Sequence, residues 1–416
     1  MTVSQAVFCL IAAAGSAYFA LRRRRVDFYT IGFAAALLYF LPGFFGFVRS
    51  STDFYVMTPL LVETYLVFTG VLSAIIVGAI VFDTTIDARP AESGLRIPMF
   101  LTTESALLIA GLAFAITFMT SGDLLFNASK SEVMDSIGRW HILFRFAAIL
   151  AVAFAAARRQ LMLGAIAVAF LCVDLFIGFR SGFAIAVLSA TVIVLGRQGP
   201  QALLVAQRKI ILLGLFVIAF LLVYKQIYTP IKLGVWSLVA DRLFSREIVT
   251  LALINSEPFT TQTVLNEVLR MEFITGPEHL SSLSGLLVPF APALGVATVS
   301  YNDLFQQELF GGVVSGGLAN NIWAQIYSIG GGALLIAAIP LYSFLLGVGS
   351  WLLHRTRGAS LVLVAVIFSF VAFYIHRNDI GYFLQLLRRV LMVWAILIVP
   401  AMLIVDARRY RRRQPA

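Results

Sequence analysis

Long apolar runs separated by short polar connections are the main pattern of this chain. Each run approaches the roughly 20 residues that an α-helix needs to cross the hydrocarbon core of a bilayer. The runs cover approximately residues 3–21, 28–48, 59–82, 101–119, 140–157, 161–179, 182–196, 210–227, 325–350, 359–375 and 390–405. This pattern predicts an all-α polytopic membrane protein of about 11 transmembrane helices, within a range of about 10 to 12.

Composition supports the same interpretation. The 416 residues are 60% hydrophobic and only 12% charged, whereas about a quarter of the residues of a soluble chain are charged. We therefore expect residues 1–416 to form a single integral membrane domain. The net charge of +10 comes from clusters between the apolar runs rather than from one soluble face, so no nucleic-acid partner is predicted.

The basic clusters fall in every second connection. They are Arg22 to Arg25, Arg89 with Arg96, Arg158 with Arg159, Arg197 with Arg208 and Lys209, Arg355 with Arg357, and Arg408 to Arg413. Because Lys and Arg concentrate on the cytoplasmic side of membrane helices, we expect the N-terminus outside and the C-terminus inside. The first apolar run precedes its arginines, which is typical of an anchor rather than of a cleaved signal peptide.

One connection is exceptionally long. Residues 229–323 form an acidic segment on the predicted external side, and connections of this length are usually functional. The stretches Ser237–Ile254 and Thr263–Phe273 have helical spacing of apolar residues. We expect them to form short amphipathic helices lying on the membrane surface.

Several basic residues lie on the external side, where the charge rule does not require them. They are Arg180, Lys225, Arg246, Arg377, Arg388 and Arg389. Arg180 lies in the tight turn GFRSG, six residues after Asp174, which is inside an apolar run. An ionisable residue within a span marks a functional site by default. The alternative is that both belong to a helix-end salt-bridge network, or that Arg180 reaches toward lipid headgroups.

The segment YIHRND forms the densest polar cluster near the membrane. It contains His376, Arg377, Asn378 and Asp379, and Arg388 and Arg389 follow one helical stretch later. Several guanidinium groups that converge are suited to bind a diphosphate. His376 is a candidate general base, and the alternative is a satisfied histidine at the membrane interface.

The long connection offers further candidates. Lys225 and Arg246 flank its beginning and are predicted either to contact the ligand or to reach toward lipid. Glu272, Asp303 and Glu308 lie nearest apolar, aromatic sequence, and each is either a general base or a solvated surface charge.

A glycine-rich stretch from Gly311 to Gly332 leads into the next apolar run. It also contains Asn320, Asn321, Trp323 and Tyr327, a combination of amides and aromatic rings that suits sugar binding. The glycines alone are also explained by close helix packing. No HExxH, CxxC, Walker, GxSxG or DxD motif occurs in a suitable place, so no metal and no cofactor are predicted.

The turn GFRSG, the long external connection before the span with YSIGGG, and the late RND followed by basic residues resemble the bacterial oligosaccharide repeat-unit polymerases, the Wzy or O-antigen polymerase family. The resemblance covers roughly residues 165–400. It implies a GT-C-like architecture in the bacterial inner membrane with an active site facing the periplasm.

The activity that the resemblance implies is metal-independent glycosyl transfer. A growing glycan moves from its undecaprenyl diphosphate carrier onto the next lipid-linked repeat unit, in the synthesis of O-antigen, lipopolysaccharide or exopolysaccharide. On this view Arg180, Arg246 and Arg377 bind the donor diphosphate and stabilise its developing charge. The implied partners are the undecaprenyl-diphosphate-linked donor and acceptor, membrane lipid and a chain-length regulator.

Two alternative functions stay open. The related O-antigen ligases carry a histidine followed by asparagine before the corresponding span, where this chain has Asn320 and Asn321. The missing histidine argues against a ligase, although His279 in EHLSSL partly matches the ligase pattern. A non-enzymatic flippase or transporter of lipid-linked glycan would need a polar cavity open to both sides, whereas the external arginines favour the polymerase.

Overall fold

The structure is a computed structural model, and it describes residues 1–22, 26–51, 56–86, 96–127, 138–196, 224, 227–228, 230–231, 233–243, 245, 254–287, 299–311 and 319–413. Within these residues, six helices are long and apolar enough to cross a membrane. They are α1 (Val3–Leu21), α4 (Val62–Thr85), α5 (Thr102–Asn127), α7 (Arg139–Arg158), α16 (Ile322–Arg355) and α18 (Ile380–Arg413). The protein is therefore all-α and of a membrane-embedded type, as the apolar runs predicted.

Shorter elements complete the fold. Four further helices are apolar: α2 (Phe28–Tyr39), α8 (Leu161–Ile177), α9 (Arg180–Leu195) and α17 (Ala359–Phe373). The remaining helices are α3 (Leu41–Phe45), α11 (Trp236–Leu243), α13 (Glu257–Arg270), α14 (Pro277–Ser284), η1 (Gly285–Leu287), α15 (Tyr301–Phe310) and η3 (Ile375–Arg377). Strands β1 (Phe47–Arg49) and β2 (Met57–Pro59) pair antiparallel, and β3 (Arg96–Ile97) and β4 (Arg357–Gly358) pair parallel.

Local sequence explains most helix boundaries. Thr2 and Asp27 accept hydrogen bonds from the backbone N–H groups of Gln5 and Thr30 and so begin α1 and α2. Gly178 ends α8 with a φ of 112°, in the left-handed region that favours glycine.

Two predicted spans differ from the structure. The run 28–48 is divided into α2, α3 and β1, because Pro42 begins a new short helix and Gly46 ends it with a φ of 85°. The run 390–405 is part of a longer helix, α18, which already begins at Ile380. The predicted span 210–227 lies largely outside the described residues, so the number of spans stays a prediction.

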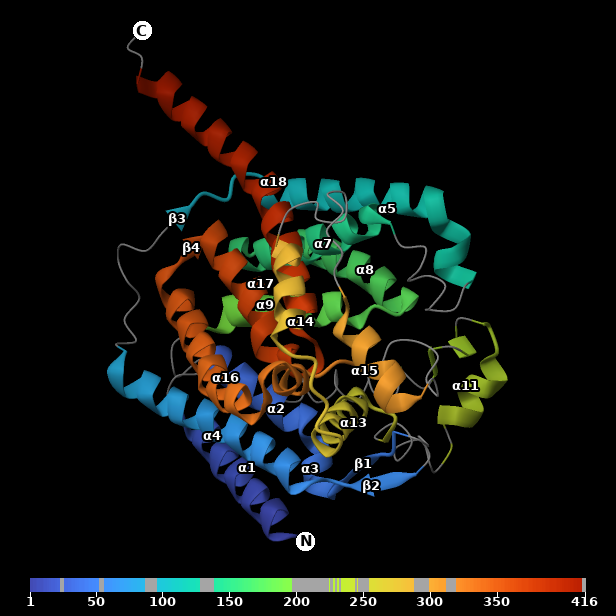
Figure 1. The fold of residues 1–416 in the computed structure, drawn as a ribbon. Coiled ribbons are helices and arrows are strands. Elements are labelled where there is room, and N and C mark those ends of the chain that lie inside the picture. Colours follow the sequence, from blue (N-terminus) through green and yellow to red (C-terminus); the bar gives the residue numbers. More distant parts are fainter. Residues whose placement is uncertain are drawn as a thin grey trace. The chain divides into compact units, whose positions relative to one another are not determined.

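The chain divides into two compact units. Unit 1 consists of Met1–Ala88, Arg246–Ser350 and Phe370–Arg388, and unit 2 of Arg89–Ser245, Trp351–Ser369 and Arg389–Ala416. Within unit 1, α1 and α2 pack against α4 (Figure 1). Within unit 2, α7 contacts α5, α8 and α9 (Figure 1). The stretch of α7 from Phe146 to Ala155 is buried on all sides, as expected of a core helix.

Helix α13 contradicts the prediction of a surface helix between Thr263 and Phe273. It is almost entirely buried in unit 1, where it packs against α2, α3, α4, β1 and η3. Its polar side chains have partners there: Asn266 Oδ1 accepts from Leu61 N (3.0 Å) and Thr64 Oγ1 (2.9 Å). The polar face is therefore turned toward protein, because polar groups of other segments satisfy it.

Helix α16 contains a break at Gly330 and Gly331. Gly331 has a φ of 64° and a ψ of −161°, a conformation that only glycine adopts without strain. The break separates a short first segment, Ile322 to Ile329, from the long apolar part of the helix. The glycine run thus allows the backbone to change direction.

A buried ionic cluster joins the ends of α1, α2 and α4 in unit 1. Arg22 binds Asp83 through two hydrogen bonds, from Nε to Oδ2 (2.6 Å) and from Nη2 to Oδ1 (2.8 Å). Arg22 Nη1 also donates to Asp27 Oδ1 (2.8 Å), and Tyr18 donates to Asp83 Oδ2 (2.8 Å). Arg22 thus fixes three helix ends at one point.

Candidate functional site

Two segments far apart in the sequence meet in unit 1. Asn320 Nδ2 donates a short hydrogen bond to Asp379 Oδ2. Gln325 Oε1 accepts from the backbone N–H of Ile380 (2.7 Å), and Trp323 Nε1 donates to His376 Nδ1 (3.1 Å). The structure therefore joins the glycine-rich stretch to the YIHRND segment. We use the name unit 1 polar cluster for these residues and for the neighbouring polar side chains of α13 and α14, which are Glu257, Thr261, Gln262 and His279.

His376 is an internal member of this cluster. Its side chain is fully buried, its Nδ1 accepts from Trp323, and its Nε2 lies 3.4 Å from the Tyr342 hydroxyl. Burial lowers the pKa of His376 to about 3, so the ring is neutral at physiological pH. Both ring nitrogens have partners, as in the alternative of a satisfied histidine, but the ring is buried rather than interfacial. We do not retain His376 as the general base.

Asp379 lies where α18 begins. Its Oδ1 accepts from the backbone N–H of Tyr382 (2.5 Å), so it caps this helix. Burial raises the pKa of the Asp379 carboxyl, against the opposing effect of its hydrogen bonds to Tyr382 and Asn320. A buried carboxylate with a raised pKa is a better proton acceptor than an exposed one.

Arg377 is held beside a carboxylate of the long connection. Its Nε lies 2.9 Å from Glu257 Oε2, an ion pair without hydrogen-bond alignment. The two side chains are 24% and 20% exposed, respectively. Burial acts to lower the pKa of Arg377, but the combined attraction to Glu257 and to neighbouring tyrosines outweighs it, and the net shift is upward. Within the described part of the chain, the two terminal nitrogens of Arg377 show no hydrogen-bond partner, so the fork of the guanidinium can bind an anion.

The amides of the cluster connect α13, α14 and α16. Asn321 Nδ2 donates to Thr261 O (3.1 Å) and Gln262 Oε1 (3.2 Å), while its Oδ1 accepts from Trp323 N (2.9 Å) and so caps α16. Gln325 Nε2 lies 2.9 Å from His279 Nε2. Asn321 thus positions the first turn of α16, which carries Trp323.

Several buried polar atoms of this region have no hydrogen-bond partner among the described residues. They are Ser256 Oγ, Thr261 Oγ1, Gln262 Nε2, His279 Nδ1 and Asn320 Oδ1. Because a buried unpaired polar group costs about 1–3 kcal/mol, such atoms call for water or a polar ligand.

The other predicted residues of unit 1, and Arg389 of unit 2, lie in varied surroundings. Asn378 Nδ2 donates to Tyr374 O (2.9 Å), and Tyr327 is half-buried on α16. Arg388 lies about two turns inside α18, and both it and Arg389 are half-buried and have interaction partners.

The three predicted carboxylate bases are all exposed. Glu272 follows α13 with a φ of 48°, and Asp303 and Glu308 lie on the exposed side of α15. This placement matches the alternative of solvated surface charges. Lys225 and Arg246 lie outside the described residues.

Unit 2 contains a separate buried ionic cluster around Asp174. Arg145 donates from Nε to Asp174 Oδ2 (2.8 Å) and from Nη2 to Oδ1 (3.1 Å), and His141 Nε2 lies 2.8 Å from Oδ1. Gly182 permits this approach, because a Cβ atom there would lie 3.2 Å from Asp174 Oδ2. Arg180 begins α9 nearby and interacts electrostatically with Tyr224. Asp174 is thus paired inside its own unit.

Sequence reasoning did not single out Arg145, His141, Glu257 or Gln262. Arg145 and His141 had a visible signal, because both lie inside a predicted span with helical i, i+4 spacing. Glu257 lies 120 positions before Arg377 in the sequence, and nothing in a single sequence indicates that the two meet.

Comparisons with known proteins add no identification. No family model, curated protein or solved structure matches this chain. The functional assignment therefore depends on the residues and geometry of the clusters themselves.

Proposed function

We propose that this protein polymerises undecaprenyl-diphosphate-linked oligosaccharide repeat units at the periplasmic face of the bacterial inner membrane. The observation that carries the proposal is Arg377, whose guanidinium is fixed at Nε by Glu257 while its fork has no partner among the described residues. A fixed, always charged fork is suited to bind two oxygens of a diphosphate.

The reaction is a glycosyl transfer. The acceptor hydroxyl oxygen attacks the anomeric carbon of the donor glycan, and a new C–O bond forms. The bond from that carbon to the diphosphate oxygen breaks, and undecaprenyl diphosphate leaves with the bonding electrons. Arg377 stabilises the negative charge that accumulates on the diphosphate, because the guanidinium is already in place before the charge develops.

Asp379 is the base in this proposal. It takes the proton of the acceptor hydroxyl as the new bond forms, while Asn320 holds its second oxygen. Glu257 is less suited, because its carboxylate is already paired with Arg377. The unpaired polar atoms of Thr261 and Gln262 offer hydrogen bonds to sugar hydroxyls.

The experiment compares polymer length on a gel from cells that lack this gene and carry wild type or a variant. Arg377→Ala and Asp379→Asn should each reduce chain extension by about 100-fold or more, the usual cost of losing charge stabilisation or a general base. Arg355→Ala is the control, since Arg355 is exposed on α16 and stacks on Trp351 far along the helix from this cluster. Full-length polymer from the Arg377 variant would remove this residue from the site.

The same gel separates the alternative functions. A ladder that collapses to single repeat units supports a polymerase, whereas loss of all surface glycan points to a ligase or a flippase. The ligase alternative has one structural argument, because His279 is buried in the same cluster, beside Gln325. His279→Ala with polymer present but no longer attached to its final acceptor would favour the ligase.

A further inference from the structure

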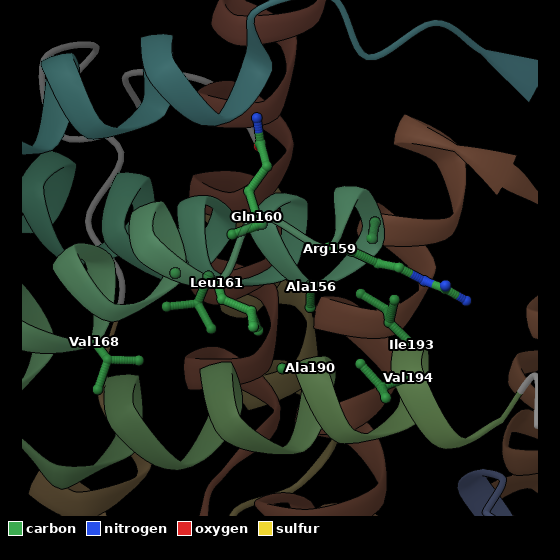
Figure 2. A pocket seen from close by; sticks show the side chains of 12 residues that line it. Ala156, Arg159, Gln160, Leu161, Val168, Ala190, Ile193 and Val194 are labelled. Carbon is green, nitrogen blue, oxygen red and sulfur yellow. The ribbon is translucent and has the colours of Figure 1, made fainter.

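An apolar cavity of about 670 Å³ lies among α7, α8 and α9 in unit 2. Leu161, Val168, Ala190, Ile193 and Val194 line it, and Arg159 lies where α7 turns into α8 (Figure 2). Its volume is in the range of about 300–1,000 Å³ that is typical of small-molecule sites. The cavity is lined by the same three helices that carry the Asp174 cluster, but by none of the residues of that cluster and none of those of the unit 1 polar cluster.

The rim of the cavity continues into an exposed apolar surface. Leu161 is 88% exposed and Val194 is 44% exposed, and Met162 beside Leu161 is also exposed. In a membrane-embedded chain, such side chains face lipid rather than water. The cavity therefore opens onto the acyl-chain region of the bilayer.

The two arginines of the α7–α8 turn differ in their partners. Arg158 Nη1 donates to Glu104 Oε2 (2.6 Å), and Gln160 donates to Glu104 Oε1 (3.0 Å). The side chains of Arg158 and Gln160 are therefore directed to α5. Gln160 also lines the cavity, and Figure 2 shows its amide end pointing away from Ile193 and Val194. Arg159, by contrast, is exposed and has no partner among the described residues. An uncompensated cation therefore lies at the mouth of an apolar cavity.

We propose that this cavity binds one anionic glycerophospholipid, with an acyl chain between α8 and α9 and the headgroup phosphate on Arg159. The charge of Arg159 complements the phosphate, and the lining complements the chain. Arg159 belongs to one of the basic connections that the charge rule assigns to the cytoplasmic side, where anionic lipids concentrate. A basic pocket between membrane helices on that side is a known form of lipid site.

The experiment is native mass spectrometry of the purified full-length protein, titrated with phosphatidylglycerol or with phosphatidylcholine of the same acyl chains. Wild type should retain phosphatidylglycerol in preference to phosphatidylcholine. Arg159→Gly should reduce retention of phosphatidylglycerol about fivefold, the effect of one interfacial arginine. Arg159 has a φ of 59°, a conformation that glycine adopts readily, so this variant should fold normally.

Matched variants separate charge from packing. Arg159→Lys should keep the preference, and Arg355→Gln should keep it as well, because Arg355 is an exposed cation that does not line this cavity. Ala190→Phe, which fills the cavity, should reduce retention of both lipids. Equal retention of the two lipids by wild type, or an unchanged preference in Arg159→Gly, would overturn the proposal. Displacement of phosphatidylglycerol by a polyprenyl phosphate would overturn the choice of occupant.

Discussion

At the residue scale, the buried ionic groups are especially sensitive to substitution. Arg22 and Asp174 are each buried, and each is compensated by more than one partner. Breaking such a pair leaves an unpaired buried charge, which costs more than the pair itself contributes. The two clusters are therefore sensitive points for folding.

We expect Asp174→Asn to destabilise the protein by about 3 kcal/mol, because Arg145 would lose its counter-charge inside unit 2. The measurement is thermal unfolding in detergent. The control is the pair Arg145→Met with Asp174→Leu, which removes both charges and should recover part of the loss. Equal stability of wild type and Asp174→Asn would show that the Asp174 charge is dispensable.

The buried His376 makes stability depend on pH. Its pKa is about 3 in the folded protein and near 6.5 when unfolded, so the unfolded chain binds a proton that the folded chain does not. The contribution of the neutral His376 ring to the stability of the fold is fully present above pH 6.5 and is lost as the pH falls toward 3. Burial also lowers the pKa of His279, so His279 changes the stability with pH in the same sense as His376.

We therefore expect the melting temperature of wild type to fall between about pH 6.5 and pH 4, with a smaller fall in His376→Gln. Tyr342→Phe is a suitable control, because it removes the neighbouring hydroxyl but leaves the titrating ring. Parallel melting curves for wild type and His376→Gln would indicate that other groups cause the acid sensitivity.

At the element scale, the break in α16 depends on one glycine. We expect Gly331→Ala to cost about 1–3 kcal/mol, because a side chain is strained at its φ of 64° and ψ of −161°. Gly332→Ala is the matched control, since nothing lies within 4 Å of an added Cβ atom there and its φ is not positive. Thermal unfolding of both variants measures the difference, and similar melting temperatures would contradict the role of Gly331.

The elements also show how far the sequence alone predicts the fold. The bounds of α1 and α7 agree with their apolar runs within a residue, because their ends coincide with caps or with basic residues. Helix α18 begins ten residues before its predicted span, since Arg388 and Arg389 are good helix formers and do not end a helix. Local pattern predicts where apolar residues lie, while partners such as Glu257 and Asn321 depend on tertiary contacts.

For the candidate site, too, the sequence predicts the residue types but not the tertiary contacts between them. The YIHRND segment and Asn320 were predicted from residue type, and the structure joins them through Asp379. The predicted surface position of α13 was wrong, because its polar residues bind groups from α4 and from Asn321 that are distant in sequence. The spacing of apolar residues shows which face of a helix is apolar and which is polar, but not which segments pack against either face.

At the scale of the whole molecule, the orientation in the membrane is the main expectation to test. We expect Asp303→Cys, exposed on α15, to react with a membrane-impermeant maleimide in intact cells. Arg355→Cys should react only after the cells are permeabilised. The background carries Cys9→Ala and Cys172→Ala, the only cysteines of the chain. The reverse labelling pattern would move the unit 1 polar cluster to the cytoplasmic side and contradict the proposed function.

The Arg22 cluster has a consequence for biosynthesis. Asp83 is translated 61 residues after Arg22, so Arg22 lacks its bidentate partner while α1 enters the membrane. In the orientation that the charge rule predicts, it adds its charge during that interval to those of Arg23, Arg24 and Arg25 and helps to retain this end of α1 on the cytoplasmic side. When α4 arrives, the same guanidinium is neutralised and binds three helices together. On this prediction, one side chain serves first in setting the topology of the nascent chain and later in its packing.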